Sequence, residues 1–92
     1  MDENQTEIVA TFRELGCSVL HLHAVGKGCP DLLVGIGGEN YLVEVKDGSK
    51  PRSQQRLTPL EAKFALEWRG RPVRVVTTPG EAIELIEAAR RV

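Results

Sequence analysis

The stretch CPDLLVGIGGENYLVEVK, residues 29–46, decides the fold that the sequence predicts. Two short apolar runs, 31–36 and 41–46, lie on either side of Gly-Gly-Glu-Asn, a composition typical of a hairpin turn. We therefore expect two antiparallel strands joined by a short connection. The run 17–23 is also rich in β-forming residues and ends at a glycine-containing loop, so it predicts a strand immediately before the hairpin.

Helical patterns flank these strands in the sequence. Apolar residues at helical spacing predict a first helix over 5–15, with Asn4 and Glu7 as a capping box at its start. A second helix is expected from Thr58-Pro59-Leu60-Glu61 to about Trp68. Its start combines an N-cap threonine, a proline at the first helical position and a capping-box glutamate.

The remaining segments complete an α/β pattern. The polar segment 47–57 predicts a mobile loop, 73–77 predicts a fourth strand, and Pro79-Gly80-Glu81 predicts the start of a last helix. The expected order is αβββαβα, which favours one mixed sheet flanked by helices. Because 92 residues are too few for a second domain, we expect a single domain over 1–92.

The charge of the chain is close to zero but unevenly distributed. Its 12 basic and 13 acidic side chains give a formal net charge of -1. Residues 1–45 carry two basic and seven acidic side chains, whereas residues 46–74 carry eight basic and three acidic ones. A basic stretch of this kind attracts phosphates, although a solvated surface has the same composition.

The sequence carries no sign of a membrane partner. No apolar run approaches the roughly 20 residues needed to cross a bilayer, and the first residues lack the basic and apolar regions of a signal peptide. We therefore expect a cytoplasmic protein, in which Cys17 and Cys29 are reduced rather than paired.

Three charged residues at the ends of the predicted hairpin strands carry the main chemical signal. Asp31 opens one strand, while Glu44 and Lys46 close the next and project to the same face. These strand ends are adjacent in an antiparallel hairpin, so we expect the three side chains to converge. Two carboxylates suit a hard divalent ion such as Mg²⁺, which binds a phosphate oxygen and lowers the pKa of a water nucleophile. The alternative is a solvated sheet face, with Asp31 as a turn residue.

Three motifs in this order of elements resemble the PD-(D/E)XK nuclease superfamily and, within it, the small virus-type replication-repair nuclease (VRR-NUC) domains. The motifs are Gly28-Cys29-Pro30-Asp31-Leu32, Glu44-Val45-Lys46 and Leu57-Thr58-Pro59. The resemblance implies a restriction-endonuclease-like fold and an endonuclease that depends on Mg²⁺ or Mn²⁺. It implies that Asp31, Glu44 and the Val45 carbonyl hold the metal, and that Lys46 is the catalytic lysine.

The same resemblance implies a biological setting. Stand-alone members of the family are expected to act as homodimers on branched DNA of the Holliday-junction type. The implied role is DNA repair in the cytoplasm of a bacterial or phage-infected cell.

This sequence departs from the family pattern at two positions. The family carries an acidic residue in its first helix, but a helical wheel places Gln5 on the inner face and Glu7 nearly opposite. We therefore expect the Gln5 amide to face the site, where it can bind a water of the metal but contributes no charge. Glu61 stands where related domains commonly show glutamine. It is either the capping partner of Thr58 or a residue that faces the site, and both interpretations stay open.

Several further residues are candidates for phosphate contacts. Lys50, Arg52 and Arg56 follow directly after the strand that Glu44 and Lys46 close. Lys27 lies in the glycine loop, residues 26–30, which precedes the strand that Asp31 opens. His23 is the histidine nearest that loop, so it is a candidate to approach the phosphate. Their alternative role is that of an ordinary solvated surface.

Two other patterns favour a structural role. A zinc site would need Cys17, His21, His23 and Cys29 together, but their spacing matches no common structural zinc site. Trp68 follows other apolar residues at helical spacing, so we expect it in the core.

Two functions are consistent with these residues. The leading hypothesis is a structure-selective DNA endonuclease, because Asp31, Glu44 and Lys46 are all present. The alternative is a nuclease-like module that binds DNA or another protein without cleaving it. The missing acid of the first helix and the low net charge favour the second hypothesis.

Overall fold

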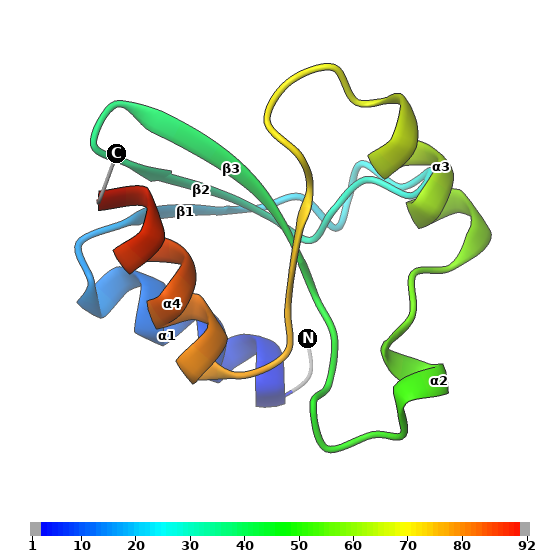
Figure 1. The fold of residues 1–92 in the computed structure, drawn as a ribbon, viewed down its shortest axis with the longest axis horizontal. Helices are drawn as coiled ribbons and strands as arrows, with labels where there is room; N and C mark the ends of the chain where they lie inside the picture. Colours follow the sequence, from blue (N-terminus) through cyan, green and yellow to red (C-terminus); the bar gives the residue numbers. More distant parts are fainter. Residues whose placement is uncertain (1–2, 91–92) are drawn as a thin grey trace.

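A four-stranded mixed sheet forms the centre of the molecule in the computed structural model, which describes residues 3–90 (Figure 1). The elements are α1 (Glu3–Glu14), β1 (Ser18–His21), β2 (Leu32–Ile36), β3 (Glu39–Val45), α2 (Arg52–Gln55), α3 (Pro59–Glu67), β4 (Arg74–Val76) and α4 (Pro79–Arg90). Strands β1, β2 and β3 are antiparallel neighbours, and β4 pairs parallel to β3. The predicted α/β class is confirmed. The predicted domain bounds, 1–92, include residues 1–2 and 91–92, which lie outside the described residues.

Two glycines close the hairpin that the sequence predicts. Ile36 pairs with Glu39, so Gly37 and Gly38 alone make the turn. Their φ angles are 60° and 80°. A two-residue turn of this type needs positive φ at both positions, which glycine adopts without steric cost. Strand β3 therefore begins two residues earlier than the sequence predicts, and Leu32 lies opposite Val43.

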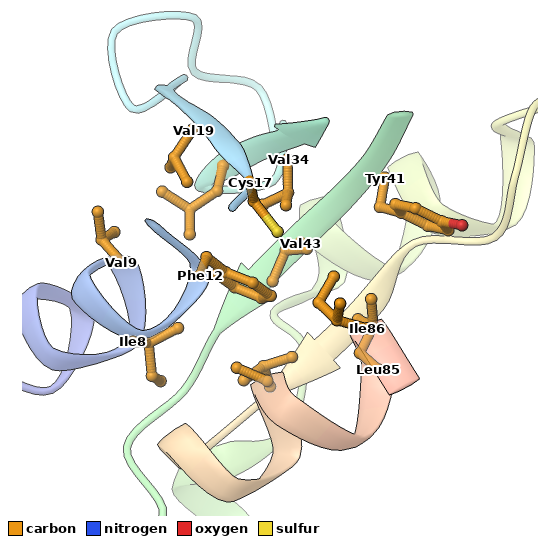
Figure 2. Packing of buried hydrophobic residues seen from close by; sticks show 13 residues of the cluster. Ile8, Val9, Phe12, Cys17, Val19, Val34, Tyr41, Val43, Leu85 and Ile86 are labelled. Atoms are coloured by element: carbon orange, nitrogen blue, oxygen red, sulfur yellow. The ribbon is translucent and has the colours of Figure 1, made fainter. Parts of the chain in front are cut away.

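One face of the sheet packs against α1 and α4, which lie side by side (Figure 1). Figure 2 shows apolar side chains of both helices against alternate residues of the strands. The core consists of Ile8, Val9, Phe12, Cys17, Val19, Leu32, Val34, Tyr41, Val43, Val76, Ala82, Leu85 and Ile86. Because neighbouring strand residues point to opposite faces, Asp31 and Glu44 lie on the face away from α1 and α4.

Helix α3 lies outside this core, and it buries none of its residues. The prediction that Trp68 belongs to the core is therefore wrong. Its side chain is 47% exposed and its ring stacks on Phe64, with the centroids 5.3 Å apart. The helical spacing of these aromatic residues reflects their contact with each other rather than burial in the core.

Two further local predictions are wrong. The segment 47–57 is not one irregular loop, because it contains α2 and the Gln55 side chain donates a hydrogen bond to the Lys50 carbonyl at 2.6 Å. Asn4 is not the N-cap of the first helix, because α1 already begins at Glu3. Its side chain instead donates to the Lys46 carbonyl just beyond β3, at 2.7 Å. None of the helices in residues 3–90 has both the length and the apolar content for a bilayer span.

Candidate functional site

Asp31 and Glu44 lie side by side where the hairpin strands end, and each carboxylate is fixed by the backbone. The Asp31 Oδ2 accepts a hydrogen bond from the Val45 amide at 2.8 Å. The Glu44 Oε1 accepts one from the Asp31 amide at 3.2 Å. The register of β2 and β3 brings these residues together, so the strand ends themselves preorganise both carboxylates.

Glu44 is buried, with only 3% of its surface exposed. A buried carboxylate is costly unless a partner compensates its charge. The Lys46 ammonium supplies part of this compensation, since its Nζ lies 3.5 Å from the Glu44 Oε2. The two side chains lie on one face because they are two residues apart at the end of β3.

Helix α3 adds a third carboxylate to this group. Thr58 and Glu61 form the predicted capping box, and the Glu61 Oε1 accepts a hydrogen bond from the Thr58 amide at 2.8 Å. The same oxygen accepts one from the Lys46 Nζ at 2.8 Å. Both roles that the sequence left open for Glu61 are therefore present at once, because one oxygen serves the helix and the lysine.

The glycine loop before β2 packs closely against the first turn of α3. Gly28 has φ 81°, and a Cβ at this position would collide with the backbone of Leu60 and Glu61. Only glycine lets the two backbones approach this closely. The contact holds Glu61 beside Lys46. Gly28 belongs to the motif quoted from the sequence, but its contact with α3 was not predicted because it joins distant segments.

The surroundings of Glu44 and Glu61 shift the pKa values of these two carboxyl groups in opposite directions. Burial and the neighbouring Glu61 and Asp31 carboxyls raise the pKa of Glu44 to about 9. Burial would raise the pKa of Glu61, but its hydrogen bonds with Glu44, Lys46 and the Thr58 amide lower it to about 2. Burial opposes the charged form of Lys46, yet Glu61 and Glu44 raise the pKa of its ammonium. The Lys46 ammonium thus contacts two carboxyl groups, those of Glu44 and Glu61, while Asp31 lies beside Glu44.

This donor set fits a divalent cation. Asp31 and Glu44 offer carboxylate oxygens that are already fixed in place, and the Val45 carbonyl follows directly in the chain. Mg²⁺ commonly binds one or two carboxylates and keeps several waters. Within residues 3–90 there is no group of three or more His, Cys, Asp and Glu side chains placed to hold a metal ion. An ion here would therefore depend on the backbone carbonyl and on water, and the four residues of the zinc hypothesis form no such group.

Helix α1 reaches the site through Asn4. Its side-chain amide donates to the carbonyls of Lys46 and Thr77, at 2.7 and 3.4 Å, and so ties α1 to the segments that follow β3 and β4. The sequence contained a signal for this, because Asn4 precedes the fully buried Ile8 by four residues and shares its helix face. Gln5 is half-buried on the same helix, and its contact with a metal water stays a prediction.

The predicted phosphate contacts occupy exposed positions. Lys50, Arg52 and Arg56 are exposed in the segment between β3 and α3, and Lys27 is exposed in the glycine loop. Lys27 also lines a shallow groove of about 320 Å³ with Lys63 of α3, a basic residue that sequence reasoning missed. The roles of Lys27, Lys50, Arg52 and Arg56 in binding DNA stay predictions.

His23 is exposed just beyond β1. The neighbouring Leu22 amide donates to the Asp31 carbonyl at 2.8 Å, so this end of β1 lies beside the start of β2. The His23 ring also lies edge-on to His21, with centroids 6.4 Å apart. The position agrees with the expected proximity to the glycine loop, and the contact with a phosphate stays a prediction.

Comparison with solved structures finds a chain described as "VRR_NUC domain". The two chains share 34% sequence identity, and the match covers 90% of this chain and 89% of that one, with a TM-score of 0.57. No family model matches the sequence, and no curated protein matches it. The likeness extends over nearly the whole length of both chains.

Proposed function

The chain belongs to the VRR-NUC family of nuclease domains, and from this we propose that it is a Mg²⁺- or Mn²⁺-dependent endonuclease that hydrolyses phosphodiester bonds in branched DNA. One observation carries the proposal. Asp31, Glu44 and Lys46 converge at one end of the sheet, where a buried carboxylate is otherwise costly.

The proposed chemistry assigns a task to each of these side chains. Asp31, Glu44 and the Val45 carbonyl would hold the divalent ion. When bound, the ion would polarise the phosphate and lower the pKa of the attacking water. Glu44 would release the proton that its raised pKa retains in the metal-free protein. The Lys46 ammonium would donate to the water or to a phosphate oxygen and would stabilise the negative charge that develops there.

Basic side chains around the site would hold the DNA backbone. We assign this role to Lys27, Lys50, Arg52 and Arg56, all of which are exposed. Contacts of this kind fix the position of the nucleic acid but read no bases. The proposal therefore includes selectivity for DNA structure rather than for sequence.

The proposed functional unit is a homodimer, because one active site cuts one strand and a four-way junction presents two equivalent strands. Exposed apolar side chains support this assignment. Leu20 and Val75 are 59% and 42% exposed on the sheet, while Leu66 and Trp68 at the end of α3 are 87% and 47% exposed. Leu20 and Val75 lie on opposite edge strands, so Leu66 and Trp68, close together in the chain, are the candidates for an apolar patch that a second copy would cover. Sedimentation showing a monomer at micromolar concentration, both free and with a junction bound, would contradict the dimer.

We also propose that the protein acts in DNA repair, in the cytoplasm of a bacterial or phage-infected cell. The two cysteines support a reducing compartment, since Cys17 and Cys29 are free thiols.

A second candidate function is a nuclease-like module that binds DNA without cleaving it. One observation favours it. The part of α1 that reaches the site carries the amide of Asn4, with Gln5 beside it, where the family pattern calls for a carboxylate. A weaker negative field at the site would reduce its affinity for a cation.

Cleavage of a labelled four-way junction beside a linear duplex of the same sequence separates the two functions. The endonuclease predicts cleavage of the junction with Mg²⁺ or Mn²⁺ and none with a chelator. Junction binding without cleavage under every metal condition would favour the binding module. Equal cleavage of both substrates would contradict structure selectivity alone.

A further inference from the structure

Helix α3 is attached to the rest of the molecule through its first turn. It buries none of its residues, so the hydrophobic core does not fix its position. The first turn, in contrast, touches the Gly28 backbone closely, and Glu61 in that turn contacts Lys46 at 2.8 Å. The placement of α3 and the placement of the lysine are therefore linked at one point.

A single oxygen makes this link. The Glu61 Oε1 accepts hydrogen bonds from both the Thr58 amide and the Lys46 Nζ, each at 2.8 Å. The Lys46 Nζ lies farther from Glu44, at 3.5 Å. The shorter contact is thus the one with α3, and the lysine side chain is 15% exposed between the two carboxylates.

We propose that Glu61 is a positioning residue that holds the Lys46 ammonium beside Glu44 through the geometry of this one oxygen. The docking of α3 on the glycine loop then sets where the lysine meets the substrate. This inference rests on the proposed function, because it assigns Lys46 a place in phosphodiester hydrolysis.

Substitutions at position 61 separate the role of the acceptor oxygen's position from the role of the negative charge. Glutamine at position 61 keeps one acceptor oxygen at the same reach, loses the charge and carries an NH₂ group in place of the second oxygen. Aspartate keeps the charge but is one methylene shorter, so it cannot serve Thr58 and Lys46 together. Alanine removes both the charge and the oxygen.

The chain offers a matched control in α4. Glu81 occupies the same position after Thr78-Pro79 that Glu61 occupies after Thr58-Pro59. The Glu81 Oε1 accepts a hydrogen bond from the Thr77 amide at 2.6 Å, and the Glu81 amide donates to the Thr78 hydroxyl at 3.1 Å. Glu81→Ala therefore removes a comparable side-chain contact at the start of a helix without touching Lys46.

The first arm of the test measures kcat and KM for cleavage of a four-way junction. We expect Glu61→Gln to stay within about threefold of the wild type. Glu61→Ala and Glu61→Asp should lower kcat by about 10²-fold with little change in KM, since a misplaced group costs about that much. Glu81→Ala should keep the wild-type kcat. Wild-type kcat in Glu61→Ala would overturn the proposal, as would an active Glu61→Asp beside an inactive Glu61→Gln, because charge would then be the determinant.

The second arm needs no metal and no DNA. A double-mutant cycle of Glu61→Ala and Lys46→Ala, read from urea unfolding of the metal-free protein, measures the coupling of the two side chains. We expect the double variant to lose clearly less stability than the sum of the single variants. Additive losses would overturn the positioning contact. If the wild type does not cleave DNA, the proposed function fails, and this cycle still decides whether Glu61 holds Lys46.

Discussion

At the scale of single residues, the chemistry of the site depends on the proton that Glu44 retains. Three carboxyl groups lie close together, only two of them contact Lys46, and Glu44 is the most deeply buried of the three. Its neutral form is therefore favoured until a cation or a rise in pH removes the proton. Repulsion among the neighbouring carboxylates destabilises the metal-free site, and a bound divalent ion would relieve this repulsion.

This protonation predicts a pH dependence of stability. The folded pKa of Glu44 is raised to about 9 from an ordinary 4.5. The stability that this raised pKa contributes is fully present at a pH below about 4.5, the pKa of Glu44 in the unfolded chain. It is lost as the pH rises from about 4.5 towards 9. Glu44→Gln mimics the protonated form. Its melting temperature should therefore rise relative to that of the wild type as the pH increases from 6 to 8.5 in the presence of a chelator. A difference that stays constant over this range would contradict the shift.

Lys46 makes a separate prediction at this scale. Lys46→Ala should lower the cleavage rate by about 10² to 10³-fold, because it removes a charge that stabilises the transition state. Calorimetric titration with Mn²⁺ should show nearly unchanged affinity, since the ammonium does not contact the ion. If Lys46→Ala instead loses its metal affinity, Lys46 has a structural role in holding the carboxylates.

At the scale of elements, the site depends on the close contact between the glycine loop and α3. Gly26 and Gly28 both have positive φ, 73° and 81°, but only Gly28 faces another backbone within contact distance. Gly26→Ala is thus a matched control. It introduces the conformational cost of a positive φ, about 1–2 kcal/mol, without the collision.

We expect Gly28→Ala to lower the free energy of unfolding more than Gly26→Ala does. It should also reduce junction cleavage strongly, because α3 must shift and carries Glu61 with it. Thermal melting and cleavage rates of the two variants check this. Equal effects of the two substitutions would show that the loop does not fix α3.

The segment between β3 and α3 predicts a salt effect on DNA binding. Each of Lys50→Ala, Arg52→Ala and Arg56→Ala should weaken binding and reduce the slope of log K against log salt by about 0.9, the value for one phosphate contact. Arg13→Ala, an exposed charge on α1, serves as the control. An unchanged slope in the triple variant would mean that the segment is merely solvated.

Local signals account for most of the elements that the sequence predicts correctly. The hairpin follows from two glycines between apolar runs, and the start of α3 follows from Thr58 and Glu61. The short helix α2 was missed because its four residues contain no buried position and no side-chain cap. The place of Trp68 depends on where α3 docks, and the sequence carries no signal for that docking.

At the scale of the whole molecule, the two faces of the sheet have different tasks. One face packs on α1 and α4 and supplies the core, whereas Asp31 and Glu44 lie on the other. Both hairpin strands are nearly continuous apolar runs, so the sequence did not predict this division and indicated only that Glu44 and Lys46 share one face. Asn4 and Glu61 contact Lys46 at the end of β3, and Gly28 packs on the backbone of α3. These contacts join segments that are distant in the chain, so no local pattern reveals them.

The central claim is that Asp31 and Glu44 are the carboxylates on which metal-dependent DNA cleavage depends. The most direct measurement is cleavage of a four-way junction in Mg²⁺ or Mn²⁺ by Asp31→Asn and Glu44→Gln, with folding checked by circular dichroism. Glu39→Gln is the control, because Glu39 is an exposed hairpin residue paired with Arg71 at 2.9 Å. Both site variants should fold and lose at least about 10²-fold in rate, while Glu39→Gln keeps the wild-type rate. Cleavage near the wild-type rate by either folded site variant would contradict the account.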